Sequence, residues 1–211
     1  MDGIMLEEDP QHRETLLGIT IDANLKWHGQ IKSLLEKLRS RLAGLAHVRH
    51  VLPYNLLKIV SEGVFNSVLG YCLPLFGGCD VGEIQDLQVM QNKAAQLVTN
   101  SPPRSIRNPM YDRLGWLTVN QLVIYHTLLA VYRVRTTGEP EYLAESLCNY
   151  NRNGHIILKS TKLTLLKESF KFRGACNWNA LPNSLRSLSK IGAFKKGVKV
   201  WIKQHVPRFL D

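Results

Sequence analysis

The chain has 211 residues, a net charge of +10, 45% hydrophobic residues and 21% charged residues. This length accommodates one domain with a real core or two small ones, and the apolar share is ordinary for a globular protein. No window holds the roughly eighteen uncharged apolar residues of a membrane helix, so we expect no membrane partner. Residues 1–10 are acidic, unlike a signal peptide, and we expect an intracellular protein of nucleus or cytoplasm that is not secreted.

Residues 1–27 are predicted to form a short β-hairpin. Residues 4–6 are apolar, residues 7–13 are polar and contain Pro10, and residues 16–22 read LLGITID, as a buried strand would. Within this second run, Gly18 indicates a bulge or a close backbone approach.

Residues 28–148 are predicted to form an antiparallel helical bundle, because leucine and isoleucine recur at spacings of three and four from Ile31 to Leu45. Pro53 ends this first helix and opens a second that runs to about residue 69. Residues 70–79 are predicted to be a loop. Two later helices begin with a capping-box pattern, Asp80 with Glu83 and Thr118 with Gln121, and a short helix is expected over residues 106–114.

Residues 149–211 carry most of the positive charge. This segment contains thirteen lysines and arginines and only two acidic residues, Glu168 and Asp211, which gives it a net charge of +11. Since the whole chain carries +10, residues 1–148 carry −1. Residues 155–172 are predicted to be extended or irregular, and residues 193–206 to form a final amphipathic helix. Such a basic segment on a near-neutral body favours an anionic partner, of which nucleic acid is the commonest. The alternative is that the lysines only keep the protein soluble.

No catalytic, metal or cofactor site is expected. The sequence has no phosphate-binding glycine loop, no hydrolase or zinc-protease motif, and no adjacent aspartates that would bind two magnesium ions. The four cysteines include no C-x-x-C pair. His47 and His50 lie three apart on a predicted helix, but no third ligand accompanies them, and a solvated helix end explains them better.

The candidate nucleic-acid contacts are basic residues of the C-terminal segment. Lys171 and Arg173 flank Phe172, with Trp178 nearby, and basic residues among aromatics can clamp phosphates and stack bases. For the rings themselves we favour a small core instead. In the final helix, phosphate contacts are expected from Lys195, Lys196, Lys199 and Lys203. The same lysines could meet an anionic membrane surface, an alternative that Trp201 keeps open.

Several ordered motifs resemble one family, the LINE-like (Jockey-like) non-LTR retrotransposon reverse transcriptases. The run LLGITID resembles the family's primer-grip hairpin, with Leu17, Gly18 and Ile19 in the grip, and the helices that follow resemble its thumb. The resemblance continues in the runs LQVMQNKAA (residues 87–95), LGWL (residues 114–117) and SFKFRGACNWNALP (residues 169–182). Gln96 stands where the family usually has arginine.

The resemblance covers nearly the whole chain. It implies that the chain corresponds to the C-terminal, non-catalytic part of such a reverse transcriptase. In that family the catalytic aspartates lie upstream of the Leu-Gly strand, on the palm domain, which would be a partner in the full-length protein. We therefore expect a mainly helical chain that holds template-primer RNA or DNA by its backbone and has no polymerase activity alone. The alternatives are a helical protein-interaction module, a functionless transposon relic, and a fragment that completes a polymerase in trans.

Overall fold

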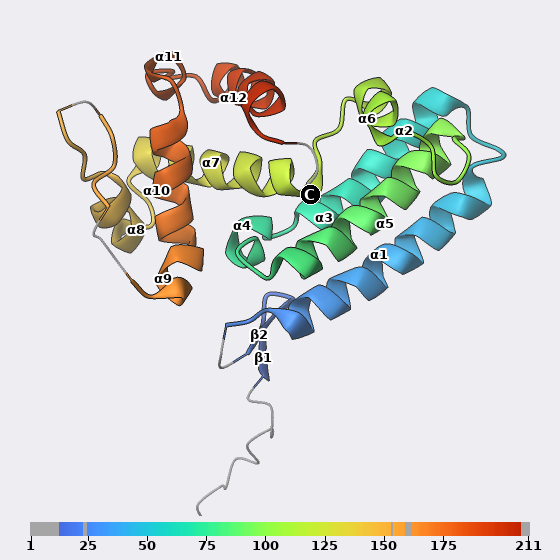
Figure 1. The fold of residues 1–211 in the computed structure, drawn as a ribbon, viewed down its shortest axis with the longest axis horizontal. Helices are drawn as coiled ribbons and strands as arrows, with labels where there is room; N and C mark the ends of the chain where they lie inside the picture. Colours follow the sequence, from blue (N-terminus) through green and yellow to red (C-terminus); the bar gives the residue numbers. More distant parts are fainter. Residues whose placement is uncertain (1–12, 23–24, 153, 159–161, 208–211) are drawn as a thin grey trace, which may run out of the picture.

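A computed structural model describes residues 13–22, 25–152, 154–158 and 162–207, and it is mainly helical, as expected (Figure 1). One group of helices lies within residues 28–114, and a second group lies within residues 141–180. A long helix over residues 119–137 runs between the two groups, and the last two helices, within residues 183–205, lie along one side of it.

The N-terminal hairpin is present, but its turn lies elsewhere than predicted. Strands β1 (Arg13–Leu16) and β2 (Ile19–Asp22) pair antiparallel, with Leu16 opposite Ile19. The turn is the pair Leu17-Gly18, whose φ angles of 50° and 78° are both positive, as in a two-residue type I′ turn. The prediction of one strand over residues 16–22 was wrong, because Gly18 permits the reversal inside that run. The predicted partner strand, residues 4–6, lies outside the described residues.

The first helical group follows the predicted periodicity closely. Its longest helices, α1 (His28–Val48) and α5 (Val81–Thr99), pack against each other. Between them the chain forms α2 (Tyr54–Ser61), the π-helical turn η1 (Glu62–Asn66), α3 (Ser67–Gly70) and α4 (Leu73–Phe76). The short α4 lies inside the predicted loop, where Leu73 and Phe76 are fully buried. Burial of those two side chains stabilises a turn of helix in a stretch that local composition marks as irregular.

The two predicted capping boxes had different outcomes. Thr118 and Gln121 form theirs at the start of α7 (Val119–Thr137). Asp80 makes no side-chain cap on α5, and the Glu83 carboxylate, which would complete the box, instead accepts a hydrogen bond from His28 of α1. The predicted short helix is α6 (Arg107–Leu114). By length and composition the stretch Arg107–Thr137 could cross a membrane, but 56% of its apolar window is buried inside the fold, which is typical of a core helix.

The C-terminal segment is more helical than predicted. After α8 (Glu141–Leu147) and an irregular stretch, the chain forms helices α9 (Thr164–Glu168), α10 (Phe170–Ala180), α11 (Asn183–Arg186) and α12 (Ile191–His205). The extended or irregular prediction for residues 155–172 was therefore wrong from residue 164 onward. The Ser169 side chain caps α10 at the amide of Phe172, and α10 buries one face against α7. This capping and burial outweigh the poor helix propensity of the sequence around Gly174.

Two hydrophobic clusters meet along α7. Val119 and Val123 belong to the first cluster, which α1 and α5 complete, and Val131 and Val134 belong to the second, which α10 and α12 complete. The predicted segments were 1–27, 28–148 and 149–211. The basic segment 149–211 packs its apolar residues on α7, so a large part of the second core comes from residues before 149.

Candidate nucleic-acid interface

The basic face of α12 is the clearest feature among the predicted contacts. Phe194, Val198 and Ile202 are fully buried, and the ring of Phe194 stacks on Tyr132 of α7 with centroids 4.3 Å apart. Because the buried residues follow each other at spacings of four, they form one stripe, and the lysines fall beside and opposite this stripe. The core therefore fixes which way this basic face points.

Three of the four α12 lysines are exposed and uncommitted. Within the described part of the chain, no hydrogen bond or ion pair engages the ammonium groups of Lys195, Lys196 and Lys199. Lys203 is half-buried and has an interaction within the protein. The first three lysines are thus the ones most available to an anionic ligand, and Lys203 flanks them one turn further on.

Lys199 also lines a cleft where the two helical groups meet. The cleft has a volume of about 360 Å³ and brings Lys58 of α2 to the same space. Aromatic and polar side chains complete its wall, including Trp116, Tyr125, Asn66 and Glu62. The Glu62 carboxylate accepts a hydrogen bond of 3.1 Å from the Trp116 indole, which leaves two lysines and one engaged acid in the cleft.

One buried polar atom of this cleft lacks a partner. The Asn66 Oδ1 atom makes no hydrogen bond to any described residue, although it is removed from solvent. A buried polar group without a partner is destabilising, and it is a position where a ligand or water donor would be favourable. Sequence reasoning missed Lys58 and Asn66, because they lie in the near-neutral part of the chain and only the packing of α12 brings them near Lys199.

Lys171 and Arg173 belong to α10 and differ from the exposed α12 lysines in their surroundings. Lys171 is exposed at a groove of about 470 Å³ whose wall includes Leu147 and Ile157. The Arg173 guanidinium instead donates hydrogen bonds of 2.8 and 2.7 Å to the carbonyl oxygens of Glu168 and Pro74. Burial lowers the pKa of Arg173. Both hydrogen bonds of this guanidinium are therefore made within the protein, and the one to Pro74 connects α10 to α4.

The two aromatic residues predicted near these basic side chains differ in their exposure to solvent. Trp178 is buried in the second core, with the Arg135 guanidinium 4.7 Å from its ring and Phe194 on another side. Phe172 is half-buried. For Trp178 the structure confirms the prediction of a core residue. Its ring is buried and has no exposed face on which a base could stack.

The hairpin residues of the predicted primer grip lie next to α3. Ile19 is buried in the first core, whereas the Leu17 side chain is exposed at the turn. The Tyr71 hydroxyl donates a hydrogen bond of 2.9 Å to the Leu17 carbonyl oxygen, and Gly18 holds the turn beside it. The hairpin tip is thus anchored to the helical group and presents one large apolar side chain to solvent.

The motifs that carry the family resemblance are used by the fold itself. In α5, Gln91 is buried, accepts a hydrogen bond from the Tyr111 hydroxyl and donates one to the Leu117 carbonyl. In α10, Gly174 passes so close to Val131 that an added Cβ would lie 2.9 Å from its methyl carbon. Asn179 bonds both the amide and the carbonyl of Ile156. The contacts of these residues are all within the protein and serve the packing of the fold.

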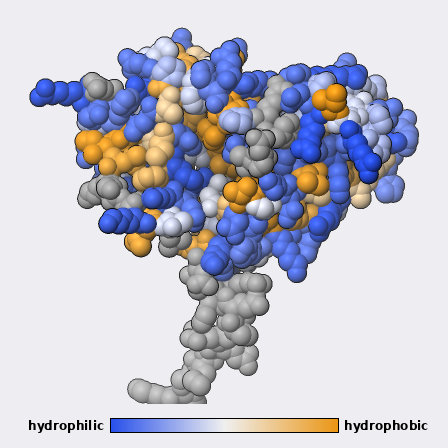
Figure 2. Space-filling model, viewed as in Figure 1, coloured by the Kyte–Doolittle hydropathy of each residue, from blue (hydrophilic) through white to orange (hydrophobic). Residues whose placement is uncertain are grey.

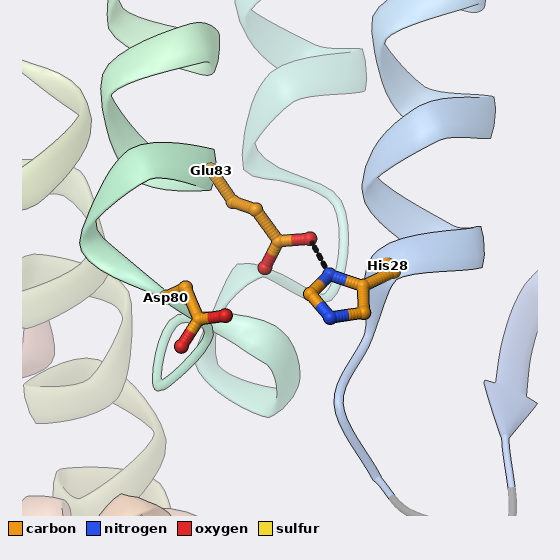
Figure 3. Close-up of side chains that lie close together, drawn as sticks. All are labelled: His28, Asp80 and Glu83. Atoms are coloured by element: carbon orange, nitrogen blue, oxygen red, sulfur yellow. Dashed lines mark hydrogen bonds and ion pairs between the residues drawn. The ribbon is translucent and has the colours of Figure 1, made fainter.

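The histidines form a different cluster from the pair considered in the sequence. The His47 ring bonds the Ala43 carbonyl, and His50 accepts a hydrogen bond from Arg49. His28, Asp80 and Glu83 instead come together across α1 and α5 (Figure 3). Sequence reasoning missed this cluster because 55 residues separate His28 from Glu83.

Comparisons of the chain with protein families, with curated proteins and with solved structures gave no match. The likeness to retrotransposon reverse transcriptases therefore rests on the ordered motifs of the sequence.

Proposed function

We propose that this chain binds nucleic acid through the phosphate backbone, without reading base sequence. The single observation that supports this most is the exposed face of Lys195, Lys196 and Lys199, whose ammonium groups have no partner in the described protein. Lysine ammonium groups bind phosphates as point charges and carry no sequence information by themselves. The rigid attachment of α12 to the core pre-orients this face and lowers the entropic cost of binding.

The cleft beside Lys199 extends this surface toward the first helical group. A nucleic-acid strand that follows α12 would meet Lys58 and the Tyr125 and Trp116 side chains at the cleft. In the reading that the motifs favour, the ligand is a template-primer duplex and the chain is the non-catalytic C-terminal part of a reverse transcriptase. The catalytic aspartates would then belong to a palm domain, and this chain alone would not extend a primer.

A salt titration of binding tests the proposal. Fluorescence anisotropy with a labelled RNA–DNA duplex should give an association constant that falls linearly on a log–log plot against salt. For three phosphate contacts the slope is about −3, since each contact on a duplex contributes about −0.9. The affinity should be equal for duplexes of unrelated sequence. Absence of binding to any RNA or DNA at low salt would refute the proposal.

A protein-binding role is the second candidate, and one observation favours it. The wall of the groove beside Lys171 includes the large apolar side chains of Ile157 and Leu166, which are about half exposed. Figure 2 shows an apolar area over the end that α8 to α10 form, within an otherwise mostly hydrophilic face. Replacing Leu166 by Ser should weaken capture of a protein partner under this alternative and leave nucleic-acid affinity unchanged.

A further inference from the structure

Three side chains from two helices converge at the start of the first helical group. His28 is the first residue of α1, Asp80 precedes α5, and Glu83 lies in the first turn of α5 (Figure 3). One ligand atom of each lies within 4.8 Å of the others. In Figure 3 the imidazole and the two carboxylates point toward a common space between the helices.

From this geometry we infer a binding site for one divalent transition-metal ion of the Zn²⁺ type, with His28, Asp80 and Glu83 as ligands. Imidazole nitrogen and carboxylate oxygen are ordinary Zn²⁺ ligands, and a site with three protein ligands leaves a position for water. Ligand atoms of a tetrahedral site lie about 3.4 Å apart when the bonds are about 2.1 Å. In the present cluster His28 Nδ1 and Glu83 Oε1 lie closer than this, at 2.5 Å, and the ligand atoms are spread over distances of up to 4.8 Å. Rotation of the exposed His28 and Asp80 side chains would bring all three groups to metal-binding positions.

A second, independent observation comes from Glu83. Its Oε1 atom lies 2.5 Å from His28 Nδ1, while its Oε2 atom is buried and has no hydrogen-bond partner among the described residues. A carboxylate oxygen removed from water without a donor is costly, and a cation offsets this cost.

The cluster also explains why the predicted capping box is absent. Glu83 at its capping position would turn back to the amide of Asp80, but the structure directs it across to His28. Cys79 directly precedes Asp80, but its sulfur is not among the ligand atoms that lie within 4.8 Å of one another, so it is not counted as a ligand.

Metal binding here would fasten the hairpin to the helical group. The Asp22 carboxylate at the end of β2 accepts hydrogen bonds from the amides of Lys26 and Trp27, directly before His28. An ion held by His28 and Glu83 would therefore connect this joint to the start of α5. The inferred effect of the ion is on stability, and the site stands independently of nucleic-acid binding.

Zn²⁺ titration against a chromophoric chelator tests the inference on the purified full chain. We expect one ion per chain and a higher thermal unfolding midpoint with Zn²⁺ than with chelator. His28→Gln should weaken Zn²⁺ binding by more than the roughly 10–100-fold that loss of a ligand's supporting partner costs. Co²⁺ should give a visible absorption band of a low-symmetry site without a thiolate charge-transfer band.

His47→Gln is the matched control, because His47 is an exposed histidine of the same helix. It should retain wild-type Zn²⁺ affinity. Asp80→Asn provides a second test at an exposed position, where loss of the fold is not expected, and it should also weaken binding. Equal Zn²⁺ affinity of the wild type, His28→Gln and Asp80→Asn would overturn the site, as would an equal loss in His47→Gln.

Discussion

Lys58 of α2 and Lys199 of α12 line one cleft, although they belong to opposite ends of the chain and to helices that pack in different hydrophobic clusters. This relationship joins the near-neutral first group of helices to the basic segment in a single surface. It makes the proposed interface larger than α12 alone, and the charge distribution along the sequence does not reveal it.

Arg173 is expected to contribute to stability more than to nucleic-acid binding. Replacing it by Met removes the donors to the carbonyls of Glu168 and Pro74, and hydrogen bonds from a charged group contribute about 1.5–3 kcal/mol. Urea denaturation should show a loss of about 2 kcal/mol in the free energy of unfolding. Lys171→Met, at the exposed neighbour, should change it by less than about 0.5 kcal/mol. Undiminished stability with a weakened duplex affinity would instead make Arg173 a ligand contact.

The hairpin turn depends on the backbone freedom of Gly18. A Cβ there would meet no atom within 4 Å, so the effect of Gly18→Ala comes from the φ angle of 78° alone. We expect a loss of about 1–2 kcal/mol and faster hydrogen exchange of the β2 amides. Gly44→Ala, also in open space but within α1, should instead raise stability by about 0.5–1 kcal/mol. Equal effects of the two substitutions would contradict the assigned turn.

The partly buried His126 of α7 should make the stability of the fold sensitive to acid. Burial lowers the pKa of its imidazole below the usual value of 6.5. Above pH 6.5 the folded and unfolded states are both neutral at this group. As the pH falls from there toward the folded pKa, only the unfolded state takes up the proton, so the folded state loses stability. His126→Gln should reduce the decline in the free energy of unfolding between pH 7 and pH 5, measured with chelator present. An unchanged decline would show that other groups cause it.

The elements that the sequence predicts well are those that depend on neighbours along the chain. Thr118 and Gln121 cap α7 as their spacing indicates, and the leucines of α1 bury the face that their period defines. The amphipathic period of α12 likewise predicts that Phe194 is buried and that the lysines are on the exposed part of the helix. Amphipathic period and helix caps are local properties, so a single sequence carries them.

The errors arise where distant residues decide the local outcome. Glu83 leaves its capping position because His28 of another helix competes for it. The stretch from residue 164 to residue 172 holds α9 and the start of α10. These helices are stabilised because α10 packs against α7 and α9 packs against α10, and no local pattern in the sequence reveals those contacts. Trp178 among basic residues is as consistent with stacking on bases as with core packing, and only its neighbours Phe194 and Arg135 decide. The cluster of His28, Asp80 and Glu83 was missed for the same reason.

The most direct test of the account is charge reversal of α12. The triple variant Lys195→Glu/Lys196→Glu/Lys199→Glu should lose nearly all affinity for an RNA–DNA duplex, and its salt slope should fall by about 3. The matched control is Lys32→Glu/Lys37→Glu/Lys93→Glu, three exposed lysines of α1 and α5 with the same change in net charge. The account predicts that this control keeps most of the wild-type slope. Equal losses in both variants would show that net charge alone drives binding, and would contradict α12 as the interface.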